Sequence, residues 1–160
     1  YHLYLNGLYW GLYQTQEHAE SSYAARYFGG KDEDYDVLKA RPSEDGRATD
    51  GTDKGWRELW ELANAMAAED LPEERLRLCR ALQGLNAEGL VDEDFPVYLD
   101  VDNLIDYMLI IFVTGNFDAP VSQFARNFYT NNWFSIWRRN GRDGFQFFCH
   151  DSEQIGRAHV

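Results

Sequence analysis

The sequence is poor in cysteine, in basic residues and in long apolar runs. Two cysteines in 160 residues, Cys79 and Cys149, cannot build a disulfide framework, although one bridge remains possible. Fifteen Lys and Arg face 27 Asp and Glu, a formal net charge of −12. This balance argues against nucleic acid or an anionic membrane surface as the main partner. The longest apolar run, Met108–Val113, is far short of the roughly 20 residues that span a bilayer.

The composition nevertheless supports a folded core. Hydrophobic residues make up 44% of the chain and aromatic residues 16%, so disorder is excluded as the general state. The length suits one domain of modest size. Strand-like segments come first, helices follow, and a loop and a second hairpin end the chain. This order predicts an α+β domain rather than a doubly wound sheet.

Two hairpins are predicted from turn chemistry. Asn6-Gly7 favours a tight turn between strands at 2–5 and 8–15. Asn140–Gly144 separates two alternating segments, 133–138 and 145–149. A further short strand is predicted at 35–40, and the polar segment 41–53 is predicted to be a surface loop.

Helices are predicted from the spacing of apolar residues and from end signals. The first covers 17–28 and ends at Gly29-Gly30, and the second covers 56–66. Pro72 begins a third, which ends near Gly84. The last covers 101–113 and is almost wholly apolar after Asp106, which predicts a buried central helix. The segment 115–132 is predicted to be a long loop.

Polar groups follow two apolar elements. Asp118 follows the apolar helix, where a carboxylate can act as a base or bind a cation. His150 and Asp151 follow the strand 145–149, and carboxylate oxygens are typical ligands of Mg²⁺. Asn131-Asn132 offers amide oxygens for the same purpose. Taken alone, each segment is more typical of a turn or capped loop than of a site.

Several common sites are missing from the sequence. It contains no Gly-x-x-x-x-Gly-Lys-Ser/Thr phosphate loop, no Gly-x-Ser-x-Gly motif and no Cys/His zinc set. No second histidine lies at ligand spacing from His150, which is therefore predicted to be a hydrogen-bonding neighbour rather than a metal ligand.

Taken together, these segments resemble the CotH family, atypical protein-kinase-like proteins named after a bacterial spore coat protein. The resemblance rests on segments in the family's order: LYLNGLYWGLY (3–13) with the Glu17 that follows, YFGGKDEDYDVLK (27–39), DVDNLIDYMLIIFVTGNFD (100–118), NNW (131–133) and GFQFFCHDSE (144–153). It implies a partial atypical protein-kinase-like fold and phosphoryl transfer from ATP, with Mg²⁺ or Mn²⁺, to a Ser hydroxyl of a coat or cell-surface protein.

The resemblance also implies roles for individual residues. Asp118 matches the catalytic-loop Asp, and Asp151 matches the metal-binding Asp of Asp-Phe-Gly. Asn131 or Asn132 matches the metal-binding Asn. Lys39 is the candidate for contacting nucleotide phosphates, with Glu17 as its partner, although Glu17 precedes Lys39, the reverse of the usual kinase order.

Two features depart from ordinary kinases. The Asn should lie five residues after the catalytic Asp, where this chain has Gln123, so the segment 119–130 must fold back. A kinase core also needs roughly 250 residues, well above the lower end of usual domain size. We therefore expect a fragment, incomplete at both ends, that need not be active alone.

The last six residues resemble the translation of a common sequencing adapter. Ile155–Val160 reads IGRAHV, and we expect it to be non-native, following a partial CotH-type domain at 1–154 in a metagenomic fragment.

Two other functions compete with the kinase hypothesis. The aromatic first hairpin could serve a non-catalytic adhesion or binding protein on the same fold. A carboxylate-pair hydrolase would need a second acid opposite Asp118, and the sequence identifies none. Mg²⁺-dependent ATP binding distinguishes the kinase from the adhesion protein.

Overall fold

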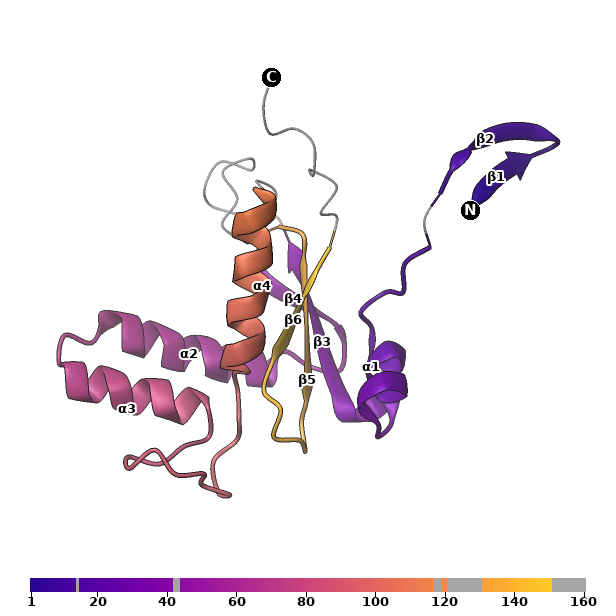
Figure 1. Cartoon of the computed structure of the whole chain (residues 1–160). Coiled ribbons are helices and arrows are strands. Elements are labelled where there is room, and N and C mark those ends of the chain that lie inside the picture. Colours follow the sequence, from indigo (N-terminus) through magenta and orange to yellow (C-terminus); the bar gives the residue numbers. More distant parts are fainter. Residues whose placement is uncertain (14, 42–43, 117–118, 121–130, 151–160) are drawn as a thin grey trace.

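The computed structural model describes residues 1–13, 15–41, 44–116, 119–120 and 131–150, with only the backbone described at 41 and 44–46. It contains a two-stranded sheet, a four-stranded sheet and four α-helices within these residues (Figure 1). The predicted α+β class is confirmed.

The first hairpin stands apart from the rest of the molecule (Figure 1). Strands β1 (His2–Leu5) and β2 (Leu8–Leu12) pair in antiparallel fashion. Asn6 and Gly7 have φ values of 50° and 78°, as a tight hairpin turn requires. The turn prediction is confirmed, while the second strand is shorter than predicted.

The main sheet is antiparallel and has the order β4-β3-β5-β6. Its central strands are β3 (Tyr35–Arg41) and β5 (Trp133–Arg138), and β6 (Gln146–Cys149) completes the predicted second hairpin. Strands that lie about 100 residues apart in sequence, β3 and β5, are direct neighbours. The sheet therefore brings the first part of the chain against its last part.

The predicted loop at 41–53 is wrong, because strand β4 (Glu44–Asp50) occupies most of it. This strand pairs with β3 at one edge of the sheet. Arg47 and Thr49 are exposed, while Ala48 and Asp50 are partly buried. An edge strand keeps polar residues on its solvent side, and its pairing is non-local, so its polar composition resembles that of a loop.

The helices agree with the prediction except at one start. They are α1 (Ser21–Phe28), α2 (Lys54–Ala68), α3 (Pro72–Leu82) and α4 (Val101–Thr114), with a 3₁₀ turn, η1, at Asp32–Asp34. The first helix was predicted from residue 17 but begins only at Ser21, after Glu20 in an extended conformation.

The sheet is covered by helices on both faces. Side chains of β5 alternate between the two faces, so nearly the whole strand is buried. Phe134 and Ile136 join a cluster with Ala24 of α1. Trp133 and Trp137 belong to a larger cluster that includes Trp56 of α2 and residues of α4.

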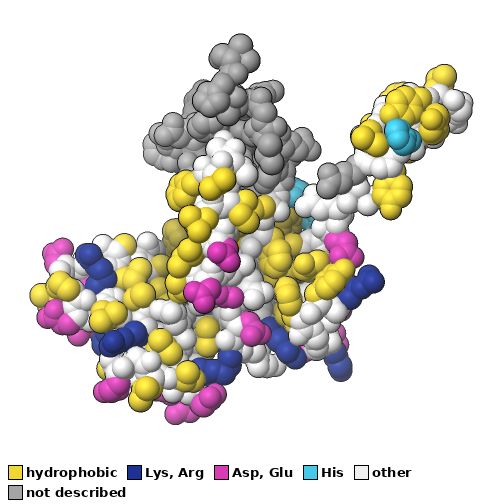
Figure 2. Space-filling model, viewed as in Figure 1, with side chains coloured by type: hydrophobic (Ala, Val, Ile, Leu, Met, Phe, Trp, Pro, Cys, Tyr) yellow, Lys and Arg dark blue, Asp and Glu magenta, His cyan; other side chains and the backbone are white. Residues whose placement is uncertain are grey.

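Helix α4 has the predicted extent, but its predicted burial is wrong. Asp100 caps its start by accepting a hydrogen bond from the Asn103 backbone N–H at 2.9 Å, and Gly115 ends it with a φ of 62°. Only Tyr107 and Ile111 are buried, because the helix contacts the sheet on one side. The exposed apolar residues form a band along its outer face (Figure 2): Ile105, Leu109, Ile110, Phe112 and Val113.

Among the helices of the described residues, none is both long and apolar enough to cross a lipid bilayer.

Candidate functional site

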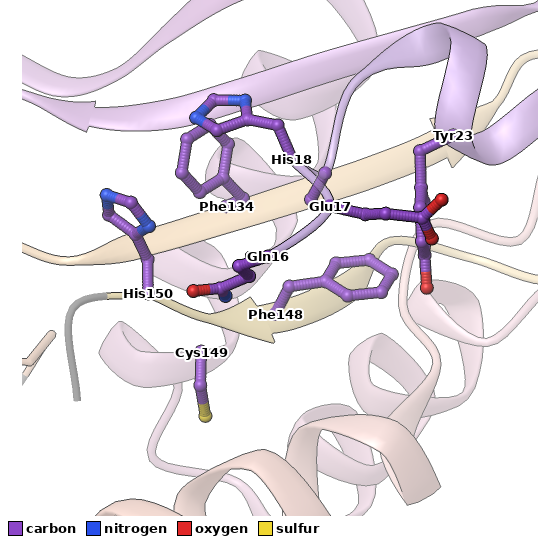
Figure 3. A pocket seen from close by; sticks show the side chains of 9 residues that line it. Gln16, Glu17, His18, Tyr23, Phe134, Phe148, Cys149 and His150 are labelled. Carbon is purple, nitrogen blue, oxygen red and sulfur yellow. The ribbon is translucent and has the colours of Figure 1, made fainter. Parts of the chain in front are cut away.

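A small pocket lies between the segment before α1 and the end of the main sheet. Its volume is about 210 Å³. Figure 3 shows the side chains that line it. They are Gln16, Glu17, His18, Ala19, Tyr23, Phe134, Phe148, Cys149 and His150.

At one end of this pocket, three basic side chains surround the buried ring of Phe134. The Lys39 ammonium lies 5.2 Å from the ring centroid, a cation–π distance. The rings of His18 and His150 meet Phe134 edge-on, with centroids at 4.7 Å and 5.0 Å. Lys39 and Phe134 are cross-strand partners of β3 and β5. Sheet pairing thus places Lys39 beside Phe134, and two other segments bring His18 and His150 to the same ring.

Glu17 lies at the other end of the pocket, beside Tyr23 (Figure 3). Its carboxylate accepts a hydrogen bond of 2.6 Å from the Tyr27 hydroxyl and lies 3.8 Å from the Arg26 guanidinium. The hydrogen bond to Glu17 raises the pKa of Tyr27. No ion pair within the described part of the chain joins Glu17 to Lys39. The predicted pairing would need Glu17 to leave its partners on α1.

The predicted site residues are partly brought together. Glu17 lines the pocket, Lys39 lies against its wall at Phe134, and His150, the residue before Asp151, completes that wall. Asp118 and Asp151 themselves lie outside the described residues, so their predicted approach to a common cleft stays a prediction.

The predicted amide ligands come directly before β5. Asn131 and Asn132 are both partly buried, and Asn132 has a φ of 50°, a conformation that asparagine tolerates better than most residues. Within the described residues, no group of three or more His, Cys, Asp or Glu side chains is arranged to hold a metal ion. Amide oxygens fit a hard cation such as Mg²⁺, and the carboxylate predicted to complete the set is that of Asp151.

Two residues that are important for the geometry of the pocket, His18 and Phe134, were not identified as candidates from the sequence. His18 follows Glu17, and Phe134 is the second residue of β5, so both are next to predicted positions. A strand in which every residue is apolar or small, WFSIW, is typical of burial on both faces, which could have identified Phe134 as a shared wall.

A comparison with protein families identifies the relationship. A family model described as CotH kinase protein matches residues 1–154. The chain belongs to the CotH kinase protein family. It is therefore kinase-like by family, as the sequence motifs predict. No curated protein and no solved structure matches the chain.

Proposed function

We propose that this CotH family chain is the part of an ATP- and divalent-metal-dependent protein kinase that binds the nucleotide, and that the kinase phosphorylates Ser on coat or cell-surface proteins. One observation carries the proposal. Glu17 and His150, the residue before Asp151, line one pocket although they are far apart in sequence, and Lys39 lies over the ring of Phe134, which forms part of the wall of that pocket. Convergence of family-matched positions is what a nucleotide site requires.

The chain's residues have distinct proposed roles. Lys39 contacts the phosphates, and Asp118 accepts or orients the proton of the Ser hydroxyl. Asp151, with Asn131 or Asn132, holds Mg²⁺ or Mn²⁺. The cation, when bound, neutralises phosphate charge. Phosphoryl transfer needs positioning and charge stabilisation more than covalent chemistry, and these groups supply both.

The burial of Lys39 supports its role. Its side chain is partly buried in the central strand of the sheet, and its ammonium lies over an aromatic face rather than in open solvent. Such a group has lost part of its hydration shell, so an anion meets a smaller desolvation cost there than at a free surface lysine. The strand also fixes its direction.

One observation favours the second candidate, a surface-binding protein. The hairpin β1–β2 and its flanks expose eight large apolar side chains, visible as the separate lobe in Figure 2. They are Tyr1, Tyr4, Leu5, Leu8, Tyr9, Trp10, Leu12 and Tyr13. Exposed apolar patches of this kind mark interaction sites.

Calorimetric titration of the chain with ATP tests the proposal. Wild type should bind ATP in the presence of Mg²⁺, and Lys39→Ala should weaken binding by about tenfold, as expected for loss of one charge-assisted contact. Lys54→Ala is the matched control, because Lys54 is an exposed lysine at the start of α2. Absence of ATP binding by wild type would reject the kinase proposal and favour the surface-binding candidate.

A further inference from the structure

The pocket has a basic end, and the proposed function assigns a role to only one of its basic side chains, that of Lys39. Two of the chain's four histidines, His18 and His150, have ring centroids 5.9 Å apart and share the Phe134 ring with Lys39. In Figure 3 the two histidine rings lie at the Phe134 end, away from Glu17. A gathering of basic groups is unusual in a chain with a net charge of −12.

The acidic groups near the pocket, among the described residues, are engaged by other side chains. Glu17 is the one acid among the described residues that line it, and its carboxylate is engaged by Tyr27 and Arg26. The Glu20 carboxylate lies 3.0 Å from Nδ1 of the His18 imidazole. A protonated imidazole donates from both nitrogens, so His18 can keep this contact and offer Nε2–H to a phosphate oxygen.

The size of the pocket limits what it can hold. Pockets for drug-sized ligands usually span about 300–1,000 Å³, and this one measures about 210 Å³. It suits one end of a nucleotide rather than a whole one. The Lys39 ammonium lies 5.2 Å from the centroid of the Phe134 ring, and the His18 ring centroid lies 4.7 Å from the same point. The ammonium and the imidazole therefore cannot be further apart than the sum of these two distances.

We propose that His18 is a phosphate-binding residue that acts with Lys39 at the Phe134 end of the pocket. The inference rests on the proposed function and deepens it, because it assigns the phosphate end of the nucleotide to this wall. The Glu20 carboxylate orients the imidazole, and the Phe134 ring keeps His18 and Lys39 close to one another.

Isothermal calorimetry with sodium tripolyphosphate tests the inference with a ligand that has phosphate groups but no nucleoside, and in the absence of a divalent cation. The chain is titrated at pH 6.0 in EDTA, where free imidazole is mostly protonated. Wild type should bind tripolyphosphate, and His18→Gln, which keeps a polar side chain without the charge, should weaken binding by about tenfold. His2→Gln is the matched control, because His2 also contacts an aromatic ring, that of Tyr9 at 5.8 Å, but lies on the hairpin.

A parallel titration with ATP and Mg²⁺ separates this inference from the proposed function. If wild type and His18→Gln bind tripolyphosphate equally, or if wild type binds ATP with Mg²⁺ but no tripolyphosphate, the role of His18 is overturned and the nucleotide site stands. If wild type binds neither, both proposals fall. Thermal unfolding of each variant shows whether the fold is kept, and His18→Ala provides a second variant if His18→Gln is unstable.

Discussion

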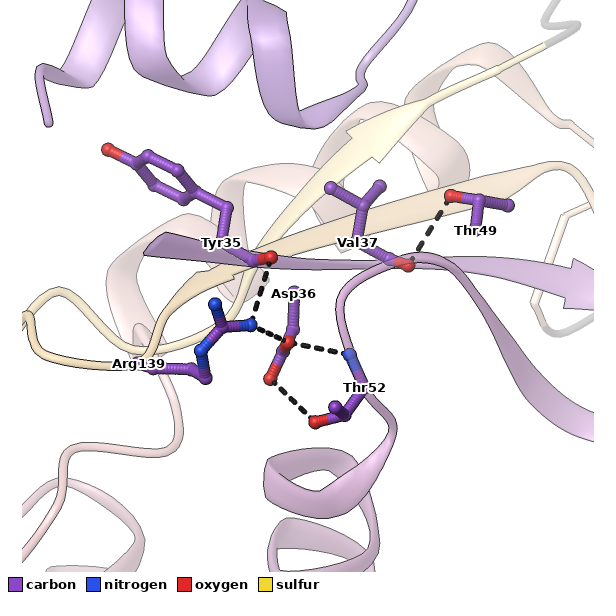
Figure 4. Close-up of polar contacts among 6 residues, drawn as sticks. All are labelled: Tyr35, Asp36, Val37, Thr49, Thr52 and Arg139. Carbon is purple, nitrogen blue, oxygen red and sulfur yellow. Dashed lines mark hydrogen bonds and ion pairs between the residues drawn. The ribbon is translucent and has the colours of Figure 1, made fainter. Parts of the chain in front are cut away.

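The carboxylate of Asp36 is fully buried in β3 and is paired with the guanidinium of Arg139, at the turn of the second hairpin (Figure 4). The Thr52 backbone N–H donates to the same carboxylate at 2.7 Å, and Arg139 also donates to the Tyr35 carbonyl at 3.2 Å. One buried side chain therefore joins the central strand, the segment after β4 and the β5–β6 turn.

Removal of this carboxylate should destabilise the fold strongly. Asp36→Ala leaves the Thr52 N–H and part of Arg139 without their acceptor, so the free energy of unfolding should fall by about 3–5 kcal/mol. The control is Asp53→Ala, because Asp53, the partly exposed residue directly before α2, pairs with the exposed Arg57 at 2.6 Å. Its loss should stay within about 1 kcal/mol. Urea denaturation measures both, and equal losses would contradict the structural role of Asp36.

Helix α4 offers a paired test of burial on one element. Ile111 is 3% exposed, whereas Phe112 is 63% exposed. Ile111→Ala should cost about 2–5 kcal/mol of unfolding free energy, because it leaves a cavity against the sheet. Phe112→Ser should change that free energy by no more than about 0.5 kcal/mol and should reduce self-association. Urea denaturation and analytical ultracentrifugation report the two effects, and a large loss in Phe112→Ser would show that the outer face is covered.

How far the sequence predicts this fold depends on whether each signal is local. The Asn6-Gly7 turn, the Pro72 helix start and the helix end at Gly29-Gly30 are encoded by the residues that form them, and they were predicted correctly. Strand β4 was missed because its residues form a strand only through pairing with β3, which the local sequence does not show. The burial of α4 was predicted wrongly because apolar residues surround the helix, so their pattern does not distinguish a covered face from an open one.

The candidate site likewise depends on both local and non-local features of the sequence. Lys39 and Glu17 were identified through family motifs, but the position of Lys39 over Phe134 depends on the pairing of β3 with β5 across about 100 residues. A motif gives the identity of a side chain and not its neighbours. His18 became apparent only once the pocket placed it beside Phe134.

Stability should fall in alkaline solution because of two tyrosines, Tyr107, which is buried, and Tyr98, which is partly buried. Burial, together with a hydrogen bond of 2.8 Å to Glu58, raises the pKa of Tyr98 from 10.0 to about 12, and burial also raises the pKa of Tyr107. The unfolded chain loses these protons near pH 10, before the folded chain does. The stability that the neutral hydroxyls contribute is therefore complete below pH 10 and is lost as the pH rises towards 12.

Phenylalanine variants test this pH dependence. Tyr107→Phe and Tyr98→Phe should lose less unfolding free energy than wild type between pH 9.5 and pH 11.5 (roughly the window set by the two ionisations). Tyr98→Phe should also be less stable at pH 8, because it lacks the Glu58 hydrogen bond. Tyr4→Phe, on the exposed hairpin, should follow the wild-type profile. Urea denaturation at each pH provides the values, and identical profiles for all variants would exclude the buried tyrosines as the cause.

The two predicted catalytic aspartates should fail in different ways. Asp151→Ala removes the carboxylate that is proposed to hold the cation, so Mg²⁺-dependent ATP binding and transfer should both be lost. Asp118→Ala removes the group proposed to orient the Ser hydroxyl proton, so ATP binding should be largely kept. The transfer rate should then fall by about 10²–10⁴, as for a positioned general base. Such a residue acts more on the transition state than on the bound substrate.

Calorimetry with ATP and Mg²⁺, beside transfer of radiolabelled phosphate to Ser-containing protein, measures the two effects separately. Asp94→Ala is the control, because Asp94 is an exposed acid in a turn away from the pocket. Full transfer by Asp118→Ala would remove that residue from the mechanism. Loss of ATP binding in Asp118→Ala, with binding kept in Asp151→Ala, would reverse the two assignments and make Asp118 the proposed ligand of the cation.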